Sequence, residues 1–414
     1  MTGGRDTLPA GPPAAGPNRP QPDPAAEIDR SLRAIQLLEQ WRERAWDPAV
    51  GLFEERLTRR LEPIPGLDRR AMVAFRQLHL YSRASRWQPA FACVADELFV
   101  RTAELFWDRR HGGWCTAADP HGRTVTDRRK QLYTHAFALL GLAEYHRLRG
   151  AGAARALAEE TFALLTRNGD PSTGFPEHVN EDWSPRAGRR EQNPHMHLME
   201  GCLALRAAGI LTEDAAALAR GLADLAERLH HRDGSIREYH HFGFSRPHAV
   251  HGAVIEPGHQ FEWAWLLTTL DQAEGTQRFR SLARRLYDDG LHLGWDRTNG
   301  GVYDEVHCDG AVLRSTKRLW PLTELIKAAR TMGDGESAGP GTSAQDRFLD
   351  EHYLLPGIGG WHERLSSGLL PIAPYLPTSS LYHLVPVLMT GLDWYRQEPA
   401  ANRTLDSDRP AQPG

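Results

Sequence analysis

Two histidines stand one residue apart in the segment QNPHMHLMEG, residues 192–201. An imidazole can bind a metal ion, and near neutral pH it can also take up and release a proton. On an α-helix, residues two positions apart point about 200° away from each other, so His195 and His197 cannot both face one ion there. Pro194 fits the first turn of a helix, and the residues after it have helical spacing. The pattern therefore disfavours a zinc site and leaves proton transfer or packing as the role of each histidine.

Five other segments show a similar mixture of aromatic, charged and histidine residues. They read RQLHLYS, LYTHAFALLG, PGHQFEWAW, RLWPLTE and SSLYHLV, and they add as candidates Arg76, Tyr133, His135, His259, Glu262, Trp320, Glu324 and His383. Four of the six segments thus offer a candidate imidazole. This group suits proton transfer at pH 7 better than a carboxylate of ordinary pKa. We therefore expect proton transfer at carbon or oxygen, with packing in a large core as the alternative for any single residue.

Six short glycine phrases recur about every 60 residues, which is typical of a repeat architecture. They begin at Gly51, Gly112, Gly174, Gly234, Gly300 and Gly359. Four carry an acid three residues after their last glycine, namely Glu54, Glu177, Asp304 and Glu363, whereas Thr116 and Arg237 depart from this pattern. A glycoside hydrolase would need two opposed carboxyl groups, and Glu177, Glu238, Asp304 and Glu363 keep that possibility open. The alternative is that these acids bind sugar hydroxyls or helix N-termini.

Between successive glycine phrases the chain has room for two helices, and the apolar periodicity supports them. We predict helices over 26–46, 68–86, 91–107, 130–149, 152–167, 194–208, 214–230, 257–273, 277–292, 316–332, 342–352 and 377–396. The odd members have an apolar stripe opposite a charged face, as outer helices do. The even members carry the aromatic and histidine clusters. We therefore expect an all-α fold, an (α/α)6 barrel with six inner and six outer helices, and a functional site at the end where the glycine phrases lie.

Composition limits the partners and the compartment. A net charge of −4 and a pI near 6.6 give no broad basic field, so we expect neither nucleic acid nor an anionic membrane as a partner. The four cysteines form no CxxC pair, which indicates buried thiols in the reducing cytoplasm. No signal peptide or membrane span is expected. We predict one barrel domain over 26–396 between disordered tails at 1–25 and 397–414.

Taken together, the motifs resemble the N-acylglucosamine 2-epimerase superfamily from about Arg30 to Tyr395. The resemblance is seen in the segments RQLHLYS, NPHMHLMEG, EPGHQFEWAWLL, GGVYDEV followed by RLWPLTE, and SSLYHLV. This superfamily includes D-mannose isomerase, cellobiose 2-epimerase and D-mannose 2-epimerase. The resemblance implies chemistry without a redox cofactor or an essential metal, through a cis-enediol or enediolate of the open-chain sugar.

The resemblance also implies roles for individual residues. His259 and His383 match the two acid/base groups. His197 matches a substrate-binding histidine that assists ring opening, with His195 behind it. Arg76 matches a residue that holds sugar oxygens and stabilises enediolate charge, and Glu262 a carboxylate that orients His259 or contacts the substrate. Tyr133 and Trp320 complete the predicted substrate-binding set.

The NPHMH and PGHQFEW segments look closer to the mannose isomerase branch, so we expect D-mannose and D-fructose as the substrate pair. A sugar 2-epimerase is the alternative within the family. An (α/α)6 glycoside hydrolase and a non-catalytic carbohydrate-binding barrel are alternatives outside it. A phosphosugar is less expected, because no Gly-rich phosphate loop or tight basic cluster is present, although Arg189, Arg190 and Arg246 could contribute. We expect a monosaccharide as the only partner of a monomer or homodimer.

Overall fold

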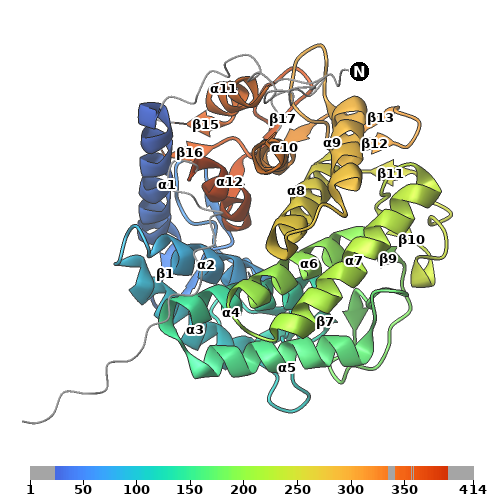
Figure 1. The fold of residues 1–414 in the computed structure, drawn as a ribbon. Coiled ribbons are helices and arrows are strands. Elements are labelled where there is room, and N and C mark those ends of the chain that lie inside the picture. Colours follow the sequence, from blue (N-terminus) through green and yellow to red (C-terminus); the bar gives the residue numbers. More distant parts are fainter. Residues whose placement is uncertain (1–23, 334–340, 356, 358, 390–414) are drawn as a thin grey trace, which may run out of the picture.

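The computed structural model describes residues 24–333, 341–355, 357 and 359–389. Within these residues the chain forms two nested rings of helices (Figure 1). The inner ring contains α2 (Ala71–Ala84), α4 (Leu132–Arg149), α6 (Gln192–Ala207), α8 (Pro257–Glu274), α10 (Leu319–Met332) and α12 (Leu381–Leu388). The outer ring contains α1 (Pro24–Ala45), α3 (Phe91–Phe106), α5 (Gly152–Asn168), α7 (Thr212–Asp233), α9 (Arg280–Gly294) and α11 (Thr342–His352). The predicted (α/α)6 barrel is confirmed.

Each inner helix packs on the next, and α12 packs on α2 to close the ring. Each outer helix from α3 to α11 packs on the inner helix that precedes it, whereas α1 packs on α12. The inner helices are buried on nearly every side; all residues of α2 are buried. This burial explains why the even helices carry tryptophan, tyrosine and histidine at positions where a helix in contact with water would carry lysine and glutamate.

Eighteen short strands join the helices at one end of the barrel. They are β1 (Trp46–Asp47), β2 (Leu52–Phe53), β3 (Arg56–Thr58), β4 (Arg69–Arg70), β5 (Ala117–Ala118), β6 (Val125–Asp127), β7 (Lys130–Gln131), β8 (His178–Val179), β9 (Arg190–Glu191), β10 (Tyr239–His240), β11 (Val254–Ile255), β12 (Glu305–His307), β13 (Val312–Arg314), β14 (Lys317–Arg318), β15 (Leu354–Leu355), β16 (Gly360–Trp361), β17 (Arg364–Leu365) and β18 (Tyr375–Pro377). Two turns of 3-10 helix, η1 (Phe242–Phe244) and η2 (Thr378–Ser380), complete the elements.

The strands follow a cyclic rule. The strand that directly precedes each inner helix pairs antiparallel with a strand of the next glycine phrase: β4 with β5, β7 with β8, β9 with β10, β11 with β12 and β14 with β17. The sixth pair joins β18, before α12, to β3 of the first phrase, in the register Tyr375↔Thr58 to Pro377↔Arg56. The first glycine phrase therefore closes the ring of loops, just as α12 on α2 closes the ring of helices.

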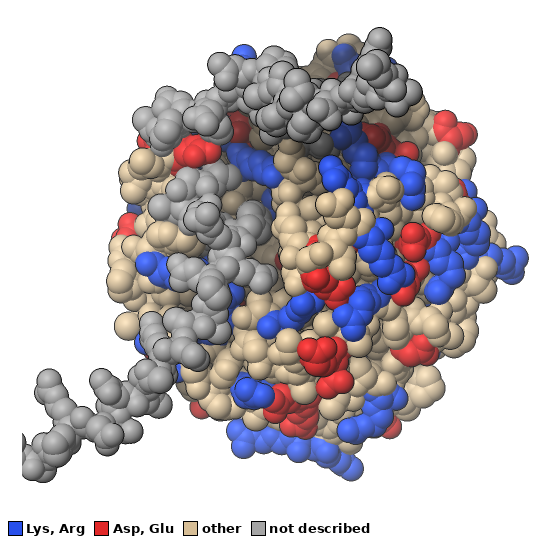
Figure 2. All heavy atoms as spheres, in the orientation of Figure 1, with Lys and Arg blue, Asp and Glu red and all other residues tan. Residues whose placement is uncertain are grey.

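The predicted helix ends agree with the observed ones to within three residues, except at the last helix. There the predicted segment 377–396 consists of η2 followed by α12, and its end lies outside the described residues, as do 1–23 and 397–414 of the predicted tails. In the part of the chain that the structure describes, no helix is long and apolar enough to cross a membrane. Basic and acidic side chains are intermingled on the face shown in Figure 2.

Candidate active site

The six inner helices each bring one residue to the centre of the ring at the same distance from the helix start. Counting η2 together with α12, the sixth residue of each inner helix is Arg76, Phe137, His197, Glu262, Glu324 or His383. We call these six residues the central cluster. All six are buried. Because every inner helix starts at the loop end of the barrel, equal depth along the helices places the six side chains at one level.

Contacts connect neighbouring members of the central cluster. The Arg76 guanidinium lies over the Phe137 ring, 4.2 Å from its centroid, and Phe137 contacts the His197 ring at 4.7 Å between centroids. His197 Nδ1 lies 3.6 Å from Glu262 Oε1. On the other side, His383 Nδ1 donates to Glu324 Oε1 at 2.7 Å. The repeat thus builds one chemical site from six helices.

Three histidines at this site share a pairing that favours catalysis. Each directs Nδ1 at a carboxylate: His197 at Glu200 Oε2 (3.1 Å), His259 at Glu238 Oε2 (2.9 Å) and His383 at Glu324 Oε1 (2.7 Å). A carboxylate on Nδ1 fixes the ring and its tautomer and leaves Nε2 for chemistry, as in other acid/base histidines.

Two other inner-helix histidines are used quite differently. His135 and His195 each donate from Nδ1 to a main-chain carbonyl one turn earlier, of Gln131 and Glu191. Each accepts a main-chain N–H at Nε2, from Trp114 at 3.0 Å and from Phe175 at 2.8 Å. Both ring nitrogens are therefore satisfied by the main chain. These two residues anchor a glycine phrase to an inner helix, which is a structural role.

The same anchoring explains two glycines of the phrases. Gly113 and Gly174 have φ of +77°, a conformation that strains other residues. A Cβ at Gly113 would lie 2.8 Å from His135 Nε2, and one at Gly174 would lie 3.0 Å from His195 Nε2. A second ring is closer still, Trp183 at Gly113 and Phe244 at Gly174, so the imidazole and this ring together leave no room for a side chain.

The acids of the glycine phrases chiefly stabilise helix starts. Their main-chain carbonyls accept the first N–H of an inner helix: Glu177 from Leu132, Glu238 from Gln192, Glu363 from Leu319 and Glu55 from Thr378. Carboxylates of the same set accept a main-chain N–H just before the next inner helix: Glu55 from Arg70, Glu177 from Glu191, Glu238 from Glu256 and Asp304 from Arg318. This bonding confirms the alternative role at helix N-termini.

Two expected positions in the glycine phrases were wrong by one residue. In the first phrase the structurally equivalent acid is Glu55, whereas Glu54 pairs with Arg69. In the fourth phrase it is Glu238, so the phrase does not depart from the acidic pattern at Arg237. Each of these two phrases has one extra residue between its glycine and its acid, which simple alignment on glycine does not show. Thr116 remains a true departure, and its hydroxyl donates to the Arg129 carbonyl.

The electrostatic surroundings of His259 and His383 are opposite. Burial lowers the pKa of His259, but the Glu238 carboxylate outweighs burial, with Glu256 and Glu262 adding to it, and raises the pKa to about 9. Burial lowers the pKa of His383 to about 3, in spite of Glu324, and the cations Arg76 and Lys327 add to the lowering. At neutral pH one ring is a proton donor and the other a proton acceptor. Environments that separate two pKa values in this way are typical of an acid/base pair.

Glu262 is the least satisfied group of the central cluster. Its side chain is 1% exposed, and neither carboxyl oxygen has a hydrogen-bond partner among the described residues. Burial raises the pKa of Glu262 well above its usual value, and Glu324 adds to this. A buried polar group without a partner is costly, and sites that bind polar ligands are where such groups occur. We expected Glu262, one turn after His259, either to orient that ring or to contact the substrate. The carboxylate that orients His259 is Glu238, so contact with the substrate stays the prediction for Glu262.

The remaining predicted binding residues lie around this cluster. Tyr133 accepts from Arg76 Nη2 at 2.6 Å and packs edge-on against the His197 ring. The Trp320 ring lies between the two histidines of opposite character, 4.8 Å from His259 and 5.8 Å from His383 between centroids. Both aromatic side chains are only partly buried. The structure therefore brings together all seven predicted site residues: Arg76, Tyr133, His197, His259, Glu262, Trp320 and His383.

Sequence reasoning missed the carboxylate partners of the histidines. Glu200 had a detectable signal, because it lies three residues after His197 on one helix face. Glu324 was noted as a candidate but given no partner. Glu238 had no such signal, since it is 21 residues from His259 and belongs to a loop.

Among the described residues, three groups have the spacing to hold a metal ion: Asp108, His111 and Glu181; His197, Glu200 and Glu262; and Glu238, Glu256 and His259. In the two groups at the site, most carboxylates already have partners. Glu200 accepts from His197 and from the Tyr382 hydroxyl, and Glu256 pairs with Arg318 at 2.5 Å. An ion would have to displace these partners.

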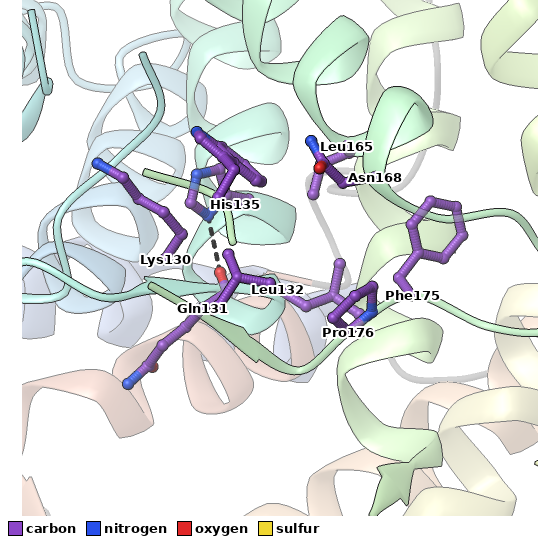
Figure 3. A pocket seen from close by; sticks show the side chains of 10 residues that line it. Lys130, Gln131, Leu132, His135, Leu165, Asn168, Phe175 and Pro176 are labelled. Carbon is purple, nitrogen blue, oxygen red and sulfur yellow. Dashed lines mark hydrogen bonds between the residues drawn. The ribbon is translucent and has the colours of Figure 1, made fainter. Parts of the chain in front are cut away.

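A separate pocket lies outside the central cluster (Figure 3). It is lined by β7, the start of α4, the end of α5 and the segment 175–183, and His135 in its wall donates to the Gln131 carbonyl. No residue of the central cluster lines it. The pocket belongs to the packing around the anchoring histidine and not to the candidate active site.

Comparison with known proteins agrees with this geometry. The sequence pattern of the family described as N-acylglucosamine 2-epimerase matches residues 51–386. Mannose-6-phosphate isomerase of Rhizobium meliloti (strain 1021) is 31% identical over 374 residues, covering 83% of this chain and 91% of that protein. D-mannose isomerase of Thermobifida fusca is 28% identical over 348 residues, covering 75% of this chain and 80% of that protein. A crystal structure of D-mannose isomerase superposes with a TM-score of 0.78 at 19% identity, covering 88% of this chain and 97% of that one, and so shares the fold.

Proposed function

Because the chain belongs to the N-acylglucosamine 2-epimerase family, we propose that it is a sugar isomerase that interconverts D-mannose and D-fructose through a cis-enediol. The family and the names of the relatives make it an isomerase or epimerase. One observation carries the finer proposal. His259 and His383 flank Trp320, and their environments leave one ring protonated and the other neutral at pH 7.

In the proposed reaction the open-chain aldose binds between these two histidines. His383 Nε2 removes the proton from C2 while His259 donates a proton to the carbonyl oxygen on C1, which gives the enediol. His383 then returns its proton to C1, and His259 recovers a proton from the hydroxyl on C2, which gives the ketose. Return of a proton to the opposite face of C2 would give the 2-epimer, so epimerisation is the second candidate.

The other members of the site support this assignment. Arg76 is a fixed buried cation whose Nε has no partner among the described residues, and it can stabilise negative charge on the enediolate oxygens. Glu262, whose carboxyl oxygens have no hydrogen bond from the described residues, can bind sugar hydroxyls. His197, whose Nδ1 is held by Glu200, assists ring opening in this proposal.

An unphosphorylated sugar fits the charges better than a phosphosugar, although one relative is named mannose-6-phosphate isomerase. Arg189 pairs with Glu191 at 3.0 Å, and Arg190 pairs with Glu177 at 3.3 Å. These carboxylates compete with a phosphate for the two arginines. A glycoside hydrolase is disfavoured, because Glu177 and Asp304 bind main-chain N–H groups and arginines. The free cysteines support a cytoplasmic location. We also propose that the protein is a monomer or a homodimer.

The test is to incubate the protein separately with mannose, fructose, glucose, N-acetylmannosamine, cellobiose and mannose 6-phosphate, and to resolve the products. Interconversion of mannose and fructose is the expected result. Formation of glucose from mannose, or of a 2-epimer from cellobiose or N-acetylmannosamine, would replace isomerisation by epimerisation. Hydrolysis of cellobiose with no isomerisation would overturn the proposal.

A further inference from the structure

We propose that Lys327 is a positioning residue for proton transfer at His383: its ammonium group fixes which of two neighbouring buried carboxyl groups, Glu324 and Glu262, is ionised. The inference rests on the proposed function for the reaction that His383 performs. It concerns a residue that belongs to none of the motifs from which the site was predicted.

Lys327 lies one turn after Glu324 on α10, and its side chain is 3% exposed. Its Nζ lies 2.6 Å from Glu324 Oε2. The ammonium also lies over the Trp265 and Tyr382 rings, 4.5 Å and 5.6 Å from their centroids. A cation in this aromatic enclosure is poorly screened by water, so its effect on nearby carboxyl groups is strong.

The two carboxyl groups have unequal partners. Glu324 receives three donors: His383 Nδ1 and Lys327 Nζ, together with Trp265 Nε1 at 2.8 Å. Glu262 receives no hydrogen bond from the described residues. Both side chains are almost completely buried. Two carboxylates that interact in such a place do not both ionise readily, and the one beside the cation keeps its charge.

The pKa shifts of the two glutamates agree with an ionised Glu324 beside a protonated Glu262. Burial would raise the pKa of Glu324, but Lys327 and His383 hold it below its usual value. Burial and Glu324 raise the pKa of Glu262. The charged and titratable groups around the pair come from the inner helices packed there: Arg76 and His79 on α2, Tyr133 on α4, His197 and Glu200 on α6, His259 on α8, and Tyr382 and His383 on α12.

Which of the two carboxyl groups is ionised matters because the ionisation state of Glu324 sets the tautomer of His383. An ionised Glu324 accepts the proton of His383 Nδ1, so the lone pair of Nε2 is free to take a proton from the sugar. A protonated Glu324 could donate to Nδ1 instead, and the proton of the neutral ring would then reside on Nε2. That tautomer cannot act as the base. Lys327 thus acts on the reaction through Glu324, without contact with the substrate.

The chain provides a matched control. It contains only three lysines, and Lys130 and Lys317 are also buried, each with Nζ 2.8 Å from an aspartate, Asp108 and Asp296. These pairs lie at the starts of inner helices and not in the central cluster. If a buried lysine–carboxylate pair only stabilises the fold, replacing Lys130 and replacing Lys327 should have the same effect. Only the replacement of Lys327 should change the tautomer of His383.

The experiment compares Lys327→Met with Lys130→Met in the full chain. We expect Lys327→Met to lower kcat by about tenfold or more with little change in KM, because the base is present in the wrong tautomer. Nitrogen NMR of the His383 ring, assigned with His383→Asn, should show the proton moving from Nδ1 toward Nε2. In a Glu324→Gln background the same change should alter kcat by less than about twofold, since the two residues act as a unit. Lys130→Met should lower the thermal midpoint only.

The inference is overturned if Lys327→Met keeps the parental kcat and the Nδ1–H tautomer while losing stability as Lys130→Met does. The NMR measurement needs no substrate, so it decides on Lys327 even if the parent turns over none of the sugars, a result that would refute only the proposed function. If Lys327→Met does not fold, infrared spectra of the parent serve instead. The part of the protonated-carboxyl band that Glu262 contributes should be lost in Glu262→Gln, whereas the band should be unchanged in Glu324→Gln, and the reverse result overturns the inference.

Discussion

Glu238 and His259 come from different elements and meet at 2.9 Å, where the imidazole Nδ1–H donates to Glu238 Oε2. Glu238 lies in the loop after α7 and His259 near the start of α8. The same carboxylate also accepts Gln192 Nε2 and the main-chain N–H of Glu256. Glu238 thus accepts hydrogen bonds at the starts of two inner helices, α6 and α8, and its carboxylate also raises the pKa of His259.

The pH dependence of turnover should show this pairing. His259 must be protonated to act as the acid, so kcat should fall as the pH rises through its pKa of about 9. In Glu238→Gln the carboxylate that raises this pKa is removed, and the falling limb should move to lower pH. The measurement is kcat against pH from about 5 to 10, which spans the range where histidine titrates. Glu177→Gln is the control, because Glu177 is the equivalent loop acid but contacts no histidine of the site. If kcat falls at the same pH in Glu238→Gln as in the parent, the acid is a residue other than His259.

The same pair should contribute to stability in a defined pH window. The folded-state pKa of His259 lies above the usual 6.5, so the folded protein binds this proton more tightly than the unfolded chain does. The stabilisation is complete below about 6.5 and is lost as the pH rises through about 9. We expect the difference in thermal midpoint between the parent and Glu238→Gln to shrink across this window. A difference that stays constant with pH would show that Glu238 stabilises only through its main-chain bonds.

His383 and His259 should be needed for chemistry more than for folding. Replacing either with Asn removes proton transfer, which typically contributes about 10² to 10⁴ in rate. We would measure the thermal midpoint and the exchange of solvent deuterium into C1 and C2 of the sugar. A retained fold with abolished exchange is expected for both variants. If either variant still isomerises mannose within about tenfold of the parent, that histidine is not an acid/base group, and Glu262 becomes the leading candidate.

Activity should survive exhaustive chelation. Each of the two residue groups at the site that could bind an ion contains a carboxylate that already has partners: Glu200 is engaged by His197 and the Tyr382 hydroxyl, and Glu256 by Arg318. Turnover of the parent before and after treatment with EDTA is the measurement. Loss of activity that a single added metal restores would contradict this expectation and would make one of the two residue groups at the site a metal centre.

The fold could be predicted because the sequence features that determine it repeat along the chain. Outer helices have one apolar face, inner helices are buried on nearly every side, and a glycine phrase returns after every pair. The central cluster follows from the same repeat, since Arg76, His197 and His383 occupy equal positions in their helices. Such positions can be found by aligning the repeats.

What the sequence did not reveal depends on contacts between repeats. The fourth phrase has one extra residue before Glu238, so an alignment on glycine does not show that this acid reaches His259; the resemblance offered Glu262 instead, as a residue that orients His259 or contacts the substrate. The separate roles of His135 and His197 could not be read from residue type. One has both ring nitrogens on the main chain, and the other faces a carboxylate.

The histidines of the segment NPHMH provide the sharpest contrast, because the same substitution two residues apart should have opposite effects. His195→Asn removes the acceptor of the Phe175 N–H, and a buried group left without its partner costs about 1 to 3 kcal/mol. We expect a lower thermal midpoint for this variant, with kcat nearly unchanged below the transition. His197→Asn leaves the glycine phrase anchored but removes a ring that faces Arg76 and Glu262, so turnover should fall while the midpoint changes less. Thermal unfolding and mannose turnover, measured on both variants, decide. Equal loss of turnover in the two variants would show that His195 also acts at the site, and the division between anchoring and catalytic histidines would then fail.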